Sequence, residues 1–226
     1  IRTDMHLTVN HSRATQPACW KRRHLSWLLP AMLLVGGCAG SFLPKGPPPA
    51  LYNLTPKSTF SDELKRVTWQ LIIEEPIANG GLDSSRIALR PRPTELQYFA
   101  DARWTERAPR MIQTLLVESF ENTDKIVAVG RQDIGLRSDF NLKIELREFQ
   151  AEYFEGVASP QVRVRLNAKL IRQPRQEIVA SRSFETLVPF ESNSGMQPII
   201  GAFDLALGRV MKKLIKWTFS HAHKGV

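Results

Sequence analysis

Long stretches that alternate between apolar and polar residues constrain the fold of this chain more than any other feature. Residues 140–146 alternate strictly, and residues 162–170 repeat the pattern. A period of two places the apolar side chains on one face of a strand. The turn at 173–175 leads into a third candidate strand, 177–188, so we expect an antiparallel meander with one solvated face. The apolar phase slips at Glu148, which predicts a β-bulge or twist there.

Two other stretches change to helical periodicity. Apolar residues recur at three- and four-residue steps over 109–120 and 198–217, which predicts amphipathic helices. Shorter strands are expected at 51–54, 67–74, 86–90, 96–99 and 126–129. The predicted fold is a single α+β domain, a largely antiparallel sheet with two amphipathic helices on one face.

The N-terminal region has the layout of an export signal. The basic cluster at 21–23 precedes the apolar run 25–37, which ends in two glycines and Cys38. This order is typical of a bacterial lipoprotein signal peptide, after which the cysteine is acylated and becomes the first residue. The run is too short for a spanning helix and contains Pro30. We therefore predict a signal peptide at 1–37 and lipidation of Cys38.

A proline-rich segment follows the predicted lipidation site. Residues 39–50 favour an extended polyproline conformation, so they form a tether. No acidic retention signal follows Cys38, which by analogy favours the periplasmic face of the outer membrane. The predicted organisation is then a tether at 38–50, a folded domain at 51–220 and a disordered tail at 221–226.

Composition sets limits on the mature chain. Removing residues 1–37 lowers the formal net charge from +9 to +5. A mild basic excess fits work near anionic lipid head groups, and it also fits an ordinary protein surface. Cys19 leaves with the signal peptide, so no disulfide is expected within the mature chain, and its stability must come from burial.

Candidate catalytic groups are scarce. Only His221 and His223 remain after export, both near the C-terminus, and no zinc-type spacing is present. Glu74 and Glu75 are neighbours, so a strand would point them to opposite faces. The arginines at 163 and 165 are interpreted as a solvated strand face rather than a nucleic-acid site. We expect no enzyme activity, no cofactor, no metal and no nucleic acid.

Taken in order, these features resemble the ABC-type transport auxiliary lipoproteins, which act beside MCE-type lipid transporters. The residues that carry the resemblance are the lipobox ending at Cys38, the proline-rich spacer, Leu51-Tyr52-Asn53-Leu54, Ile73-Glu74-Glu75-Pro76, Arg86-Ile87-Ala88-Leu89, and Tyr98–Trp104 leading into the Leu115-Leu116 helix. The resemblance implies a non-catalytic envelope protein that helps to move lipid between the inner and outer membranes. Its implied partners are an MCE substrate-binding subunit, a permease and an ATPase, with a homo-oligomer also expected.

Arg103 and Trp104 have two interpretations. Trp104 fits a packing residue at the entry to the 109–120 helix. Alternatively, both residues belong to a surface that contacts sister subunits or the transporter, since Trp and Arg are common in interface hot spots.

Two other functions stay open on the sequence. One is a structural assembly lipoprotein of another outer-membrane machine, and the other is a periplasmic carrier with its own apolar cavity. A cavity-lining strand and a core-facing strand have the same alternation, so the pattern does not separate these alternatives.

Overall fold

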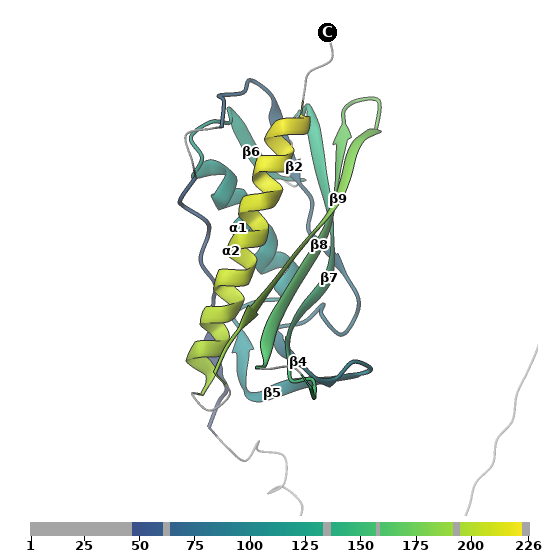
Figure 1. Cartoon of the computed structure of the whole chain (residues 1–226). Helices are drawn as coiled ribbons and strands as arrows, with labels where there is room; N and C mark the ends of the chain where they lie inside the picture. Colours follow the sequence, from purple (N-terminus) through teal and green to yellow (C-terminus); the bar gives the residue numbers. More distant parts are fainter. Residues whose placement is uncertain (1–46, 61–63, 133–136, 157–158, 192–194, 223–226) are drawn as a thin grey trace, which may run out of the picture. The chain divides into compact units, whose positions relative to one another are not determined.

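The described part of the chain forms one sheet with two helices on one of its faces (Figure 1). The structure, a computed structural model, describes residues 47–60, 64–132, 137–156, 159–191 and 195–222. Within them the sheet contains nine strands in a mixed arrangement. The predicted α+β single-domain class is confirmed.

Three long strands make up the predicted meander. β7 (Phe140–Glu152), β8 (Gln161–Arg172) and β9 (Glu177–Pro189) pair antiparallel along their whole lengths. The register between β7 and β8 shifts between Leu146 and Glu148, so the predicted bulge is confirmed. It lets Leu146 and Phe149 both face the core although they are three residues apart.

β7 is also the strand at which the two halves of the sheet meet. Its other edge pairs in parallel with β2, β3 and β4 at successive positions along its length. The remaining strands are β1 (Ala50–Tyr52), β2 (Gln70–Ile73), β3 (Ile77–Ala78), β4 (Arg86–Arg92), β5 (Glu95–Trp104) and β6 (Ala128–Arg131). β5 pairs antiparallel with β4, whereas β1 and β6 join β5 and β2 in parallel. These parallel pairings were not predicted.

Both predicted helices are present. α1 (Ala108–Glu121) begins with a proline in its first turn, a position that needs no backbone donor. α2 (Met196–His221) packs on β8 and β9 and touches α1. It extends to His221, past the predicted helix end at 217, and Ala222 caps it through a backbone bond to Thr218. The structure therefore places His221 in the last turn of α2 rather than in the tail.

Aromatic side chains fill the space between the sheet and the helices. Trp104, Phe149 and Phe203 come from β5, β7 and α2, and each ring contacts the other two at 5.0–5.5 Å between centroids. At the other end of α2, Trp69 packs between Phe140 and Phe219. Neither helix of the described chain is long and apolar enough to pass through a bilayer.

Candidate functional site

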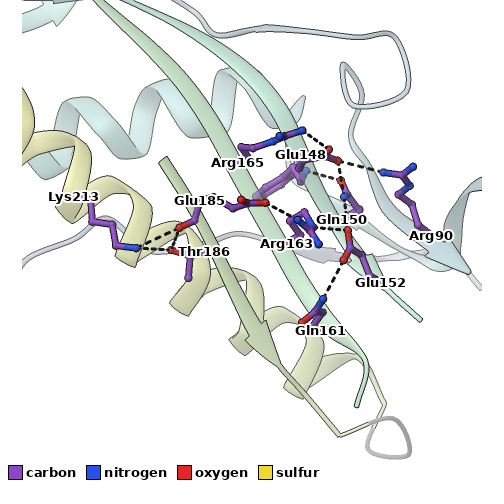
Figure 2. A network of polar contacts seen from close by, with 11 residues as sticks. Arg90, Glu148, Gln150, Glu152, Gln161, Arg163, Arg165, Glu185, Thr186 and Lys213 are labelled. Carbon is purple, nitrogen blue, oxygen red and sulfur yellow. Dashed lines mark hydrogen bonds and ion pairs between the residues drawn. The ribbon is translucent and has the colours of Figure 1, made fainter. Parts of the chain in front are cut away.

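The face of the meander opposite the helices carries a network of charged and amide side chains, here called the outer-face network (Figure 2). Its members are Arg90 of β4, Glu148, Gln150 and Glu152 of β7, Gln161, Arg163 and Arg165 of β8, and Glu185 of β9. The bulge positions it, because after the register shift the even-numbered residues of β7 point away from the core. Strand register then sets Glu148 beside Arg165.

Glu152 is the most buried charged member of this network. Its side chain is 2% exposed, although it lies on the face of the sheet away from the helices. Arg163 donates to it at 2.8 Å, and the side-chain amides of Gln150 and Gln161 donate at 3.1 and 3.3 Å. A buried carboxylate without such donors would be strongly destabilising. The surrounding donors therefore allow a charge at this position.

Arg163 links this carboxylate to the edge strand. Its other donor reaches Glu185 of β9 at 2.6 Å. Partial burial acts to lower the pKa of Arg163, but the hydrogen bonds to Glu152 and Glu185 outweigh it and raise the pKa above the ordinary value. The guanidinium thus stays protonated and ties three neighbouring strands together.

Glu148 is the second anionic centre of the network. It accepts from Arg165 at 2.7 Å, from Gln150 at 2.8 Å and from Arg90 at 3.4 Å. The contact with Arg90 connects the meander to β4 on the other side of β7. The charges are balanced within the network, so it works as a cross-strand brace.

A small cavity of about 270 Å³ adjoins this brace. It is lined by Asn79, Leu82, Arg90, Thr94, Glu95, Leu96, Arg147, Glu148 and Gln150. Arg90 and Arg147 are paired with Glu148 and Glu145, and the lining holds no histidine or cysteine. Across the described residues no three metal-binding side chains gather. The cavity can accept a small polar group, but it presents no nucleophile beside a base.

A second ionic cluster fixes the start of α1. Arg107 immediately precedes the helix and bonds to Asp83, and it also reaches Glu75 at 3.1 Å. The hydrogen bond to Asp83 raises the pKa of Arg107 above its ordinary value. Glu74 instead lies 3.5 Å from Lys143. The adjacent carboxylates therefore bind different cations, as expected for neighbours at the end of a strand.

The two residues considered for partner contact differ in exposure. Trp104 is 1% exposed and packs on Phe149 and Phe203, so its indole is a core side chain. Arg103 is half-buried on β5 and lies opposite Leu51 of the edge strand β1. Arg103 is thus the member of the pair that is open to a partner, and its role stays a prediction.

The predicted lipidation site, Cys38, lies outside the described residues, as does His223. His221 is described and sits in the last turn of α2. Its Nδ1 lies 2.8 Å from the carbonyl oxygen of Trp217 and 2.9 Å from the hydroxyl of Ser220. This ring therefore takes part in a local helix-end contact.

The arginine-rich strand face was only partly interpreted from sequence. Arg163 and Arg165 do lie on the face away from the helices, yet both form ion pairs with carboxylates of β7. The sequence did indicate polar partners for these arginines, because residues 148, 150 and 152 alternate as polar residues after the phase slip. Only the strand register shows which arginine meets which carboxylate.

A family model for the ABC-type transport auxiliary lipoprotein component matches residues 52–214. This match runs from the last residue of β1 into α2 and includes the whole of α1 and of β2 to β9. The chain belongs to this family. The sequence resemblance to these auxiliary lipoproteins is thereby confirmed.

Individual relatives match about three quarters of the chain. The uncharacterized protein bll6063 of Bradyrhizobium diazoefficiens is 31% identical over 74% of this chain, which spans only 44% of that protein's length. The crystal structure of XCC0632 from Xanthomonas campestris, assigned to DUF330, has 35% identity and a TM-score of 0.69. It covers 76% of this chain and 96% of its own, so a related domain of this size folds by itself.

A more distant crystal structure, of an uncharacterized protein, shares the fold. Its TM-score is 0.60 at 14% identity, and it covers 76% of this chain and 99% of its own.

Proposed function

We propose that this protein is the membrane-anchored auxiliary lipoprotein of an MCE-type ABC system that moves lipid between the inner and outer membranes. It acts by tethering and docking, with Cys38 as the anchor at the periplasmic face of the outer membrane. The single observation that carries the proposal is the family match over 52–214. The anchor would be supplied by the predicted lipobox and by the proline-rich tether, which both precede the matched residues.

The packing of the domain favours docking over carrying lipid. The space between sheet and helices is filled by aromatic side chains, with Trp104 and Phe203 at 1% and 0% exposure. A carrier needs an apolar cavity that a lipid tail can enter. The inner strand faces of this domain instead contact helix side chains, which leaves the outer surface for function.

Exposed strand edges offer a surface for docking. β9 has 13 residues and, among the described strands, pairs with β8 alone. Long free edges are recurrent sites for pairing with another chain. Large apolar side chains are also exposed here, with Ile178 at 55% and Leu187 at 38%. A subunit or a second copy that covered this edge would bury both.

Tethering contributes through local concentration. Once the protein is anchored by a short linker, its contact with a partner in the same membrane becomes effectively intramolecular. The effective concentration of the domain at that partner is then roughly millimolar. A weak docking contact is then occupied most of the time. This mechanism needs no catalytic group.

Affinity purification of the tagged lipoprotein from envelope membranes tests the proposal. Mass spectrometry should recover an MCE-domain protein, a permease and an ATPase in stoichiometric amounts. The matched control is the Ile178→Glu/Leu187→Glu variant, which keeps the core and places charges on the β9 edge. Recovery of secretin or barrel-assembly proteins in place of the transporter would overturn the assignment.

A further inference from the structure

Four cations form a stripe along α2, two of them exposed and two half-buried. Arg209, Lys212, Lys213 and Lys216 are spaced by three, four and seven residues from the first, so they share one helical face. The only acid of α2 is Asp204, which precedes the stripe and accepts hydrogen bonds from the backbone N–H and the hydroxyl of Thr55. The C-terminal half of the helix is therefore cationic without an acidic residue of its own.

Residues from two other segments enlarge this stripe. Lys65 and Arg66 precede β2, and Arg182 lies on β9. Together with the four cations of α2 they are called the cationic face. Lys65, Arg66 and Lys216 line one groove of about 530 Å³, while Arg182, Lys213 and Lys216 line another of about 640 Å³. Lys216 stands between the two grooves.

Both grooves combine cationic with apolar lining residues, and Glu185 also lines the second one. Phe219, Leu64 and Val67 line the first groove, and Phe184 and Trp217 line the second. Lysine and arginine stems can lie along such apolar surfaces while their charged ends stay in the head-group region. This combination fits a surface that is anionic outside and apolar beneath.

The stripe has an electrostatic cost in the isolated domain. Arg209 and Lys213, and likewise Lys212 and Lys216, are like charges four residues apart, which weakens a helix. The helix dipole offsets part of this near the C-terminus. Within the described residues, Arg209 and Lys212 take part in no ion pair. An anionic partner would relieve the repulsion.

We propose that the cationic face rests on an anionic phospholipid surface, so that the domain lies with α2 along the membrane. Most of its cations lie on separate elements or successive helical turns, which suits a diffuse layer of head groups better than one bidentate carboxylate. The inference rests on the proposed function, because the anchor at Cys38 brings the domain to a bilayer.

The tether is long enough for this orientation. The part of the tether before β1, residues 39–49, would span about 34 Å when extended at roughly 3.1 Å per residue. α2 has 26 residues and is about 39 Å long at 1.5 Å per residue. β1, where the tether enters, pairs with the end of β5 beside Phe203, far from the C-terminal end of α2 (Figure 1). With α2 perpendicular to the anchoring membrane, the cationic face would stay away from the lipid surface. With α2 parallel to the membrane, the cationic face would contact it.

Vesicle sedimentation of the purified domain, residues 48–226, measures this contact without the acyl anchor. The probes are vesicles of phosphatidylcholine with one third phosphatidylglycerol and vesicles of phosphatidylcholine alone, in low and high salt. The test variant is Arg66→Gln/Arg209→Gln/Lys212→Gln. The control is Lys143→Gln/Arg147→Gln/Lys169→Gln, which removes the same charge from the face away from the helices. Thermal melts show that each variant is folded.

Binding of the wild-type domain to the anionic vesicles, and its loss in high salt, is the expected result. Each cation near such a surface strengthens partitioning about fivefold, so the test variant should bind about a hundredfold more weakly. The control should lose less than about fivefold. Equal losses in both variants would reduce the effect to net charge and overturn the proposal, as would wild-type binding no tighter than to neutral vesicles.

This assay is independent of the transporter. Failure here, together with recovery of the ABC components in the purification, removes the membrane contact and leaves the proposed function in place. Vesicle binding without those components leaves the cationic face in place and removes the transport assignment.

Discussion

At the scale of single residues, burial separates packing from function more sharply than residue type does. Trp104 is of a residue type that is common in interface hot spots, yet its side chain is 1% exposed and lies among the aromatic rings of the core. Glutamate is seldom buried, yet the side chain of Glu152 is 2% exposed and accepts hydrogen bonds through both carboxylate oxygens. The burial of Trp104 was one of two interpretations that the sequence left open, whereas that of Glu152 was not predicted, because it depends on the register between β7 and β8.

Replacing Trp104 tests its packing role. Trp104→Ala removes a large side chain between Phe149 and Phe203 and should lower the free energy of unfolding by about 3–5 kcal/mol. Trp104→Phe keeps most of the volume and should cost less. Denaturant titration of both variants measures the difference. An alanine variant that unfolds at the wild-type midpoint would contradict the packing role of the indole.

Glu152 offers a test of the outer-face network. Glu152→Ala removes one of the two acceptors of Arg163 and one of the two acceptors of the Gln150 amide, so it should destabilise the domain by about 2 kcal/mol. The control is Glu145→Ala, whose side chain is 53% exposed in its pair with Arg147 and which should cost at most about 1 kcal/mol. A double-mutant cycle with Arg163→Ala isolates the pair. Equal costs for both glutamates would contradict a bracing role.

At the scale of elements, alternation and helical period predicted most of the sheet and both helices. The bulge near Glu148 was predictable because it disturbs the pattern within a single strand. The parallel pairing of β2, β3 and β4 with β7 was not predictable, because alternation identifies the buried face of a strand but not the strand that pairs with it. β3, with two residues, is too short to leave a periodic signal.

The segment between β1 and β2 is held to α2 by side chains rather than by regular structure. Asp204 accepts from both the backbone and the hydroxyl of Thr55, at 2.7 and 2.9 Å. Asp204→Ala should therefore speed hydrogen exchange at Thr55 and cost about 1–2 kcal/mol of stability. Asp204→Asn keeps one acceptor oxygen, so its exchange rate at Thr55 and its stability should lie between those of the wild type and the alanine variant. Unchanged exchange at Thr55 in the alanine variant would show that other contacts hold the segment.

In the whole molecule, the stable scaffold is distinct from the surfaces proposed for contact. The aromatic core and the outer-face network keep the sheet rigid, and the candidate contacts lie on the β9 edge and the cationic face. In the proposed function, activity depends on position, which the predicted anchor at Cys38 and the tether would set.

The Cys38→Ser variant, compared with the wild type for acyl labelling, membrane fractionation and lipid transport, tests the tethering mechanism. The wild type should incorporate labelled palmitate and fractionate with the outer membrane. The variant should lose the label, become soluble and fail to support transport at its normal level of expression. A soluble Cys38→Ser protein with full transport activity would contradict a tethering mechanism.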